Sequence, residues 1–288
     1  MTPVQQHREG YPWRRVLFGC SVVLLCWGIG LYREYQEIAD VRIKQVQDWA
    51  YAKTWTLASG FTAERVDSFR APLWKNEISG NVLEIGPGLG DSLLLLSRER
   101  VGRYVALEPN RHFHGALADS AKRAGFMSVG YDAESSPGAS DGEFTIVNGT
   151  LDGVPKYVVE HGPYDTVVSS MVLCSVDDLQ GTLERIWELL KPGGRFVFVE
   201  HVRHTDAMDA SVDGESEVVN LRMWGWIQEV VTPVWSLFTG NCHLNRRTGE
   251  ALDGMRGWEK VRYSTRRSSK LKDVMGPFIY GVAFKSQP

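Results

Sequence analysis

Cysteine is scarce in this sequence, and its four cysteines are too scattered to define a disulfide framework. Small secreted domains that depend on disulfides carry many more cysteines per residue. No pair has the spacing of a metal-binding motif, and Cys242-His243 has no evident partner in the sequence. We therefore expect free thiols in a chain that faces a reducing compartment, with Cys174 as a buried packing residue. The four are Cys20, Cys26, Cys174 and Cys242.

An excess of charge of one sign is also missing. The chain has 32 lysines and arginines against 35 aspartates and glutamates, for a net charge of -3. Proteins that bind nucleic acid usually present a concentrated basic surface to the phosphate backbone. We therefore do not expect nucleic acid as a partner. The length of 288 residues and the hydrophobic fraction of 43% are typical of one large globular domain or two small ones.

Long apolar runs are limited to one, at residues 16–32 (VLFGCSVVLLCWGIGLY). It carries no charge and lies between a basic tail, residues 1–15, and Arg33. A membrane-spanning helix needs about 20 such residues. We predict a retained anchor at 16–32 that contacts membrane lipid, either by spanning the bilayer or by lying in one leaflet. A cleaved signal peptide is the alternative.

The rest of the chain divides into two parts. Residues 33–76 have few prolines and glycines and place apolar residues at helical intervals, which predicts a helical linker. The linker is either a plain spacer or a cover over the active site. Residues 77–288 alternate strands with helices, one of them at 93–98 capped by Asp91-Ser92, and therefore predict a parallel sheet with helices on both faces. The expected strands are 82–85, 104–107, 144–147, 166–168 and 195–200, followed by an antiparallel pair at 260–265 and 278–284.

A glycine-rich turn, Glu84-Ile-Gly86-Pro-Gly88-Leu-Gly90, ends the first expected strand. Glycines there let the backbone approach a ligand closely. The spacing is GxGxG, whereas the dinucleotide fingerprint needs its third glycine where this chain has Asp91. An acidic residue at that position would repel a pyrophosphate. The turn therefore favours S-adenosylmethionine, a nucleoside ligand without phosphate, over a nicotinamide cofactor.

Two acidic residues flank this turn in the expected sheet. Glu84 precedes the glycines, where its carboxylate can face the ammonium group of the methionine moiety. Glu108 ends the second strand, where a carboxylate can accept hydrogen bonds from both ribose hydroxyls. A strand-end acid occurs in both cofactor classes, so Glu108 indicates a nucleoside without deciding which one.

These motifs resemble the class I methyltransferases of the type 11 group. The resemblance rests on residues 84–90, on Leu107-Glu108-Pro109-Asn110 and on the Lys191-Pro-Gly-Gly turn. Met171-Val-Leu-Cys-Ser-Val and Glu200-His201-Val202 are further similar to the methyltransferase-like-seven family of membrane-bound thiol S-methyltransferases, as is Asn241-Cys242-x-Leu244-x-Arg246. The resemblance covers about 81–285. It implies a Rossmann-like seven-stranded sheet, S-adenosylmethionine as cofactor, and an enzyme anchored at the endoplasmic reticulum or lipid droplets with its catalytic domain facing the cytosol.

The resemblance also implies a set of cofactor-binding positions. Residues after the third strand would lie near the adenine, and Ser169 and Ser170 would border the methionine end. Glu108 replaces the aspartate usual in the family, and residues 205–217 look like an insertion on the acceptor side. The implied cofactor-binding residues are Glu84, Gly86, Gly88, Gly90, Glu108, Pro109, Asn148, Gly149, Thr150, Leu151 and Ser170.

The expected reaction is methyl transfer to a small-molecule acceptor, with a thiol as the leading candidate. Methyl transfer needs alignment of the acceptor and removal of its proton where it carries one. His201, at the end of the fifth strand, is the candidate base or orienting group. The alternatives are O- or N-methylation of an apolar metabolite or lipid, and a membrane scaffold without catalysis. Trp224, Trp226, Trp235 and Phe238 line an acceptor pocket, contact the membrane surface or form ordinary core.

Overall fold

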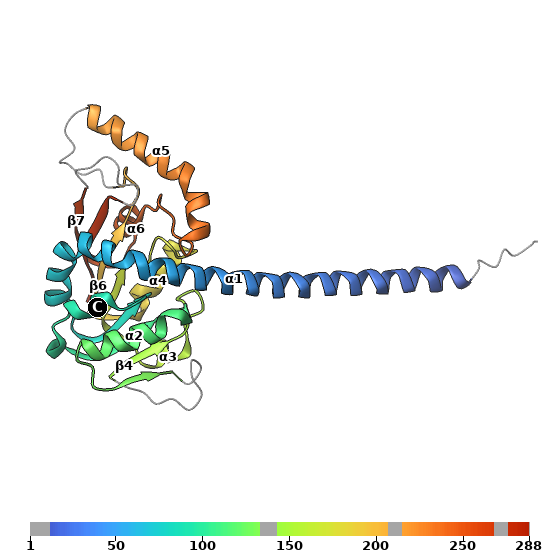
Figure 1. Cartoon of the computed structure of the whole chain (residues 1–288), viewed down its shortest axis with the longest axis horizontal. Helices are drawn as coiled ribbons and strands as arrows, with labels where there is room; N and C mark the ends of the chain where they lie inside the picture. The colour runs from blue at the N-terminus through green and yellow to red at the C-terminus, as the bar shows by residue number, and fades with distance from the viewer. Residues whose placement is uncertain (1–11, 133–142, 207–214, 268–275, 288) are drawn as a thin grey trace, which may run out of the picture. The chain divides into compact units, whose positions relative to one another are not determined.

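A computed structural model describes residues 12–132, 143–206, 215–267 and 276–287 (Figure 1). The chain divides into two compact units, residues 1–47 and 48–288. In the first unit the described structure is helix α1 (Pro12–Glu77), which continues into the second. The predicted linker is thus one helix that begins before residue 33. Within the described residues, no helix is both long enough and apolar enough to cross a membrane. The side chains of residues 12–30 lie outside that description, so the anchor at 16–32 stays a prediction.

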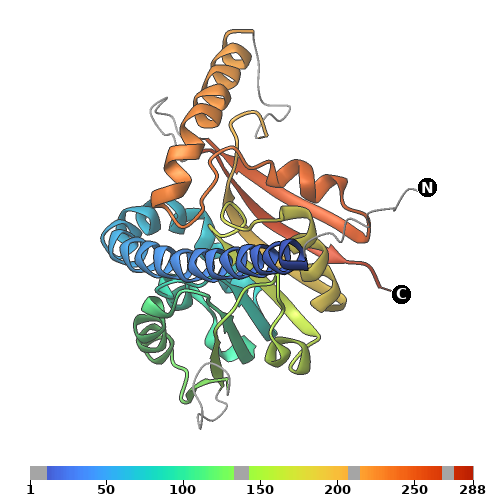
Figure 2. The ribbon, with the colours of Figure 1, turned by 90° about the vertical axis from the view of Figure 1, so that its right-hand side faces the viewer.

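The second unit is built on one eight-stranded sheet in the order β3-β4-β2-β1-β5-β6-β8-β7, with β7 and β8 at one end (Figure 2). Strands β1 to β6 run parallel, and β8 pairs antiparallel with both β6 and β7. The predicted α/β fold is confirmed, but the sheet has one strand more than the seven expected. The strands are β1 (Gly80–Ile85), β2 (Val101–Leu107), β3 (Val129–Tyr131), β4 (Phe144–Val147), β5 (Tyr164–Ser170), β6 (Leu190–His201), β7 (Trp258–Arg266) and β8 (Phe278–Lys285).

Alternation along the strands gives the sheet two buried faces. On β1, Val82 packs into one apolar cluster while Leu83 and Ile85 pack into the other, as the two-residue period of a strand requires. The C-terminal part of α1 and helix α2 contribute to the first cluster; α3, α4 and α6 contribute to the second. The helices after α1 are α2 (Arg111–Arg123), α3 (Lys156–Glu160), α4 (Leu179–Leu189), α5 (Glu215–Phe238) and α6 (Thr248–Gly254).

The prediction of a helix at 93–98 is wrong. A short 3-10 turn, η1 (Asp91–Leu95), follows the glycine-rich loop, and a second one, η2 (Arg98–Arg100), precedes β2. Gly90, in a left-handed conformation, stands at the N-cap of η1 without a side-chain cap. The hydroxyl of Ser92, expected to cap the helix, donates instead to Glu84. Residues 91–95 therefore form one short 3-10 turn after the glycine-rich loop, in place of the expected helix.

Candidate active site

The glycine-rich loop leaves the carboxyl end of β1 in a conformation that glycine favours. Gly86, Gly88 and Gly90 have φ angles of 57°, 58° and 74°. A Cβ atom added at Gly86 would lie 2.8 Å from Cγ2 of Val172, and one at Gly90 would lie 2.8 Å from Cδ1 of Leu117. The loop backbone therefore lies closely against the segment that follows β5 and against α2.

Glu108, predicted as the ribose acid, lies beside this loop. Its side chain is buried, with 4% of its surface exposed. One carboxylate oxygen accepts a hydrogen bond from the Gly88 amide at 2.9 Å, and the other accepts one from the Asn110 amide at 2.8 Å. Burial, opposed by these two hydrogen bonds, raises the pKa of Glu108 to about 7. The strand end therefore holds a carboxyl group whose charge changes near neutral pH.

Glu84 lies beneath the loop rather than on an open surface. Its carboxylate accepts hydrogen bonds from the Tyr104 hydroxyl at 2.7 Å and from the Ser92 hydroxyl at 3.1 Å. Burial raises its pKa, while these two hydrogen bonds and the charge of Arg70 lower it. Glu84 thus links β1 to β2 and to η1. Its expected contact with an ammonium group stays a prediction.

The residues predicted near an adenine follow β4, at the same edge of the sheet as Glu108. The amide of Glu108 donates to the carbonyl of Val147, the last residue of β4. Leu151 is buried, Thr150 and Pro109 are exposed, and Asn148 and Gly149 lie between these extremes. Together with Ser170 at the end of β5, the predicted cofactor-binding residues therefore come from four neighbouring strand ends, those of β4, β2, β1 and β5.

The two serines at the end of β5 point to different partners. Ser169 donates a hydrogen bond to Glu200 at 2.5 Å and is buried. Ser170 accepts one at 3.2 Å from the guanidinium of Arg70, a residue of α1. Arg70 is 7% exposed and also forms an ion pair with Asp67 at 2.5 Å. Arg70 could not be predicted from the sequence, because helical spacing in 33–76 does not indicate which part of the sheet the helix contacts.

Aromatic residues of α1 also lie at this edge of the sheet. A Cβ atom added at Gly88 would lie 3.5 Å from Nε1 of Trp55. The ring of Tyr51 packs edge-on against Phe113 of α2, with 5.9 Å between the ring centroids. The part of α1 within the second unit therefore lies against the glycine loop and against α2.

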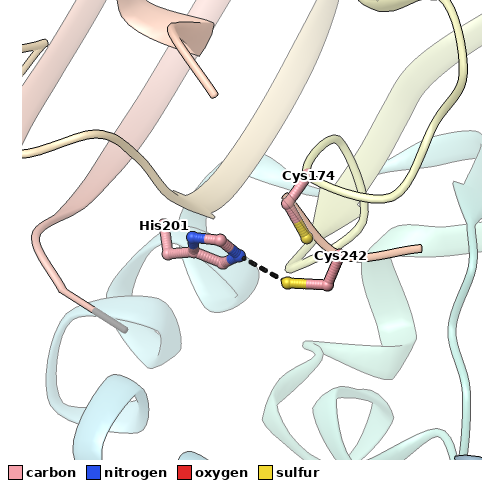
Figure 3. Close-up of side chains that lie close together, drawn as sticks. All are labelled: Cys174, His201 and Cys242. Carbon is pink, nitrogen blue, oxygen red and sulfur yellow. Dashed lines mark hydrogen bonds between the residues drawn. The ribbon is translucent and has the colours of Figure 1, made fainter. Parts of the chain in front are cut away.

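Cys174, His201 and Cys242 form a buried cluster (Figure 3). Nε2 of His201 lies 3.1 Å from Sγ of Cys242, and the donor atoms of all three lie within 4.8 Å of one another. The indole of Trp235 donates to Cys242 Sγ at 3.4 Å. Cys174 follows β5, His201 ends β6 and Cys242 follows α5. The sequence did not reveal this cluster because its members come from three distant segments without a local motif.

The predicted base, His201, is fully buried and faces Cys242. Among the described residues its Nδ1 has no hydrogen-bond partner. The hydrogen bond from Cys174 lowers the pKa of the Cys242 thiol, although burial opposes this shift. The same hydrogen bond raises the pKa of the Cys174 thiol, and burial raises it further. His201 is thus within hydrogen-bonding distance of the Cys242 thiol, which has 9% of its surface exposed.

Tyr51 connects this cluster to the glycine-loop side of the site. Burial raises the pKa of its phenol, and the nearby Cys174 and Cys242 raise it further. The charge of Glu108 also raises the pKa of the Tyr51 phenol. Groups of the cluster and of the glycine-loop side therefore both raise the pKa of Tyr51.

The aromatic residues Trp224, Trp226, Trp235 and Phe238 all belong to α5, where Trp226 and Phe238 are exposed and Trp235 contacts Cys242. These positions place the four in different environments. Most of the expected insertion at 205–217 lies outside the described residues.

Comparison with known proteins assigns the chain to a family. Residues 58–255 match a family described as a methyltransferase domain. Human thiol S-methyltransferase TMT1B is 31% identical over 210 residues, which cover 72% of each chain. Human thiol S-methyltransferase TMT1A is 31% identical over 134 residues, or 46% of this chain. The chain spans about half of the length of TMT1A (48%) and 43% of the rat TMT1B.

The fold is also found among solved structures. An O-methyltransferase family protein from Burkholderia thailandensis has a TM-score of 0.51 at 12% identity, covering 83% of this chain and 60% of that one. This likeness concerns the fold alone. The family match covers more than half of the chain, and the aligned human relative agrees with the resemblance drawn from the motifs. The chain therefore belongs to the methyltransferase-domain family and is related within it to the thiol S-methyltransferases.

Proposed function

We propose that the protein transfers the methyl group of S-adenosylmethionine to a small-molecule thiol. The observation that carries the proposal is the position of Glu108, a buried acid held by a backbone amide of the glycine loop at 2.9 Å. A carboxylate at this strand end can accept both ribose hydroxyls, while the left-handed glycines leave room for the rest of the ligand. Relatives that are thiol S-methyltransferases support the acceptor class.

The remaining cofactor contacts would come from other residues at the same edge of the sheet. Asn148 to Leu151, after β4, would lie beside the adenine. Arg70 and Ser170 would bind the carboxylate of the methionine moiety, because a guanidinium at this edge is the natural partner for a carboxylate. Arg70 is nearly buried, and its ion pair with Asp67 leaves one of its terminal nitrogens to face Ser170.

A thiol acceptor suits this site chemically. A free thiol has a pKa of about 8.5 and is partly ionised at neutral pH, so it needs little help from a base. The sulfur lone pair forms the new bond to the methyl carbon, and the electrons of the broken carbon–sulfur bond return to the sulfonium sulfur. The site has to align the two sulfur atoms and exclude water. The aromatic side chains of α1 serve the second requirement.

The enzyme would work at a membrane. The uncharged run 16–32 would anchor it to lipid, at the endoplasmic reticulum or lipid droplets, with the catalytic domain facing the cytosol. This arrangement would give apolar thiols dissolved in the membrane access to the site.

The proposal is tested with the full chain in detergent, labelled S-adenosylmethionine and a panel of alkyl thiols, phenols and amines. We expect label to appear on thiols. Transfer only to phenols or amines would keep the enzyme class and reject the thiol. Absence of both transfer and cofactor binding would favour a scaffold without catalysis.

Replacing Arg70 by methionine is expected to weaken binding of S-adenosylhomocysteine by roughly 10–100-fold, the effect of losing hydrogen bonds to a charged group. Titration calorimetry measures the affinity. The informative comparison uses 5′-methylthioadenosine, which lacks the amino-acid carboxylate and should bind the variant as well as it binds the wild type. Arg65→Met, an exposed change on the same helix, is the control. Equal losses for both ligands would mean that Arg70 only supports the fold.

A further inference from the structure

We propose that Cys174, His201 and Cys242 bind one Zn²⁺ ion, and that the fourth coordination position receives the acceptor thiol (Figure 3). The second half of this proposal rests on the proposed function; the metal site itself does not. Two sulfurs and one imidazole nitrogen form a soft ligand set that suits Zn²⁺ rather than Mg²⁺ or Ca²⁺.

The spacing of the donor atoms fits a single ion. Zinc–sulfur bonds of about 2.3 Å and zinc–nitrogen bonds of about 2.0 Å place two tetrahedral ligands roughly 3.5–4 Å apart. Here the His201–Cys242 distance is 3.1 Å, and no pair of donor atoms is more than 4.8 Å apart. Shifts of several tenths of an ångström would therefore complete the coordination.

The backbone holds the ligands in place. The amide of His243, next to Cys242, donates to the carbonyl of Cys174 at 2.9 Å. The guanidinium of Arg246 reaches the same carbonyl at 3.3 Å. These contacts bind the segment after β5 directly to the segment after α5. The two cysteines are thus held together without an ion, and the contact of His201 with Cys242 at 3.1 Å adds the imidazole, which lowers the free-energy cost of forming the site.

Supporting contacts around the sulfurs also fit a metal site. Trp235 donates to Cys242 Sγ at 3.4 Å, the kind of outer hydrogen bond that fixes a metal-bound thiolate. All three ligands are buried, so water has little access. Within the described residues, the group contains no fourth cysteine, histidine or acidic side chain. Three protein ligands with one open position are the pattern of catalytic zinc sites, whereas structural sites are closed by a fourth ligand.

The position of the cluster gives the open coordination site a role. Cys174 follows β5 and His201 ends β6, so the ion would lie at the carboxyl edge of the parallel strands, the edge at which Glu108 follows β2. Coordination to Zn²⁺ favours the thiolate, so the acceptor thiol leaves its proton in bulk solvent as it enters the site. The bound thiolate then forms a bond to the methyl carbon, and the electron pair of the broken bond goes to the sulfur of S-adenosylhomocysteine. The ion changes neither its charge nor its oxidation state.

Metal binding is tested on the full chain in detergent with a phosphine reductant. After removal of bound metal with a chelator, Zn²⁺ is titrated in competition with a chromogenic zinc indicator. We expect one ion per chain, and for Cys242→Ser and His201→Asn an affinity loss beyond the 10–100-fold typical of outer-shell changes. The matched control, Cys20→Ser with Cys26→Ser, should bind like the wild type. Binding of S-adenosylhomocysteine verifies that each variant is folded.

The role of the open position is tested by replacing Zn²⁺ with Co²⁺. We expect sulfur-to-cobalt charge-transfer bands in the near ultraviolet and d–d bands in the visible, both of which shift when an alkyl thiol is added. A wild-type chain that binds no Zn²⁺, or a folded Cys242→Ser that binds it unchanged, overturns the site. Undiminished thiol methylation by metal-free enzyme overturns the catalytic role and leaves the proposed function intact. Stoichiometric zinc without methyl transfer to any acceptor would sink the proposed function while the metal site stands.

Discussion

Replacing Glu108 by alanine is expected to weaken binding of S-adenosylhomocysteine by at least about 100-fold. The carboxylate would accept hydrogen bonds from two ribose hydroxyls, and each hydrogen bond to a charged group contributes roughly 1.5–3 kcal/mol. Losing both costs about 3 kcal/mol or more, which is a factor of 100 in affinity. Titration calorimetry on the full chain in detergent gives the dissociation constant directly.

The shorter acid is the matched control for this variant. Glu108→Asp keeps the two carboxylate oxygens and moves them back by one methylene, so a loss of less than about tenfold is expected. Comparable losses in Glu108→Asp and Glu108→Ala would mean that the position tolerates no change in packing. Unchanged affinity in Glu108→Ala would place the ribose elsewhere.

The same residue gives cofactor affinity a pH dependence. Burial raises the pKa of Glu108 to about 7, and only the ionised form can accept both hydroxyls. Affinity should therefore fall as pH drops below 7, by up to tenfold per pH unit, and level off above it. Glu108→Gln carries no charge at this position below or above pH 7. It should therefore bind S-adenosylhomocysteine weakly, with an affinity that does not change with pH. A wild-type affinity that is constant from pH 6 to 8 would contradict this assignment.

The stability of the ligand-free protein should change in the opposite direction. A carboxyl group whose pKa is raised in the folded state binds more protons there than in the unfolded chain, between the ordinary value of 4.5 and about 7. Its contribution to the free energy of unfolding therefore declines as pH rises through this window. Glu108→Gln should accordingly melt at a higher temperature than the wild type at pH 8, and the difference should shrink at pH 5.

The sheet could be predicted because its strands are short apolar runs separated by strong turn signals. Val82 to Ile85 and Phe144 to Val147 are buried strands, as their residue types indicate. The three-residue β3 could not be predicted, because so few residues show no alternation. The helix predicted at 93–98 does not form, because the Ser92 hydroxyl donates to Glu84, a buried acid eight residues earlier on β1, and capping rules consider only the helix's own amides.

The candidate site was predictable only where a motif is local. The glycine loop and Glu108 mark their own positions, since each adjoins a strand end. Arg70 and Tyr51 belong to a helix whose sequence says little about what it covers. The cysteine–histidine cluster depends on chain segments that meet only in the folded sheet. Contacts of this kind are properties of the topology rather than of any one stretch of sequence.

Replacing Glu200 by alanine is expected to destabilise the protein by about 3–5 kcal/mol, a large part of the stability of a typical domain. Glu200 is fully buried. It accepts hydrogen bonds from the Ser169 hydroxyl at 2.5 Å and from the amides of Val172 and Leu173 at 3.0 and 3.1 Å. Alanine would leave these donors unpaired away from water, and each unpaired donor costs roughly 1–3 kcal/mol.

Thermal unfolding followed by circular dichroism should show a midpoint lower by roughly 6–20 °C, since each kcal/mol shifts it by about 2–4 °C in a domain of this size. Glu184→Ala, an exposed change on α4, should shift the midpoint by no more than a degree or two. Glu200→Gln keeps one acceptor oxygen and should fall between the two. A Glu200→Ala midpoint within about 3 °C of the wild type would indicate that water enters and satisfies the donors.

The effect should extend to ligand binding, because Glu200 fixes the segment that leads from β5 to Cys174. Val172 in this segment occupies the space that a side chain at Gly86 would need. When its amide loses the carboxylate, the segment can shift toward or away from the glycine loop. Glu200→Ala, measured well below its melting temperature, should therefore also bind S-adenosylhomocysteine more weakly than Glu184→Ala. A destabilised variant with unchanged ligand affinity would mean that the glycine loop keeps its shape without this support.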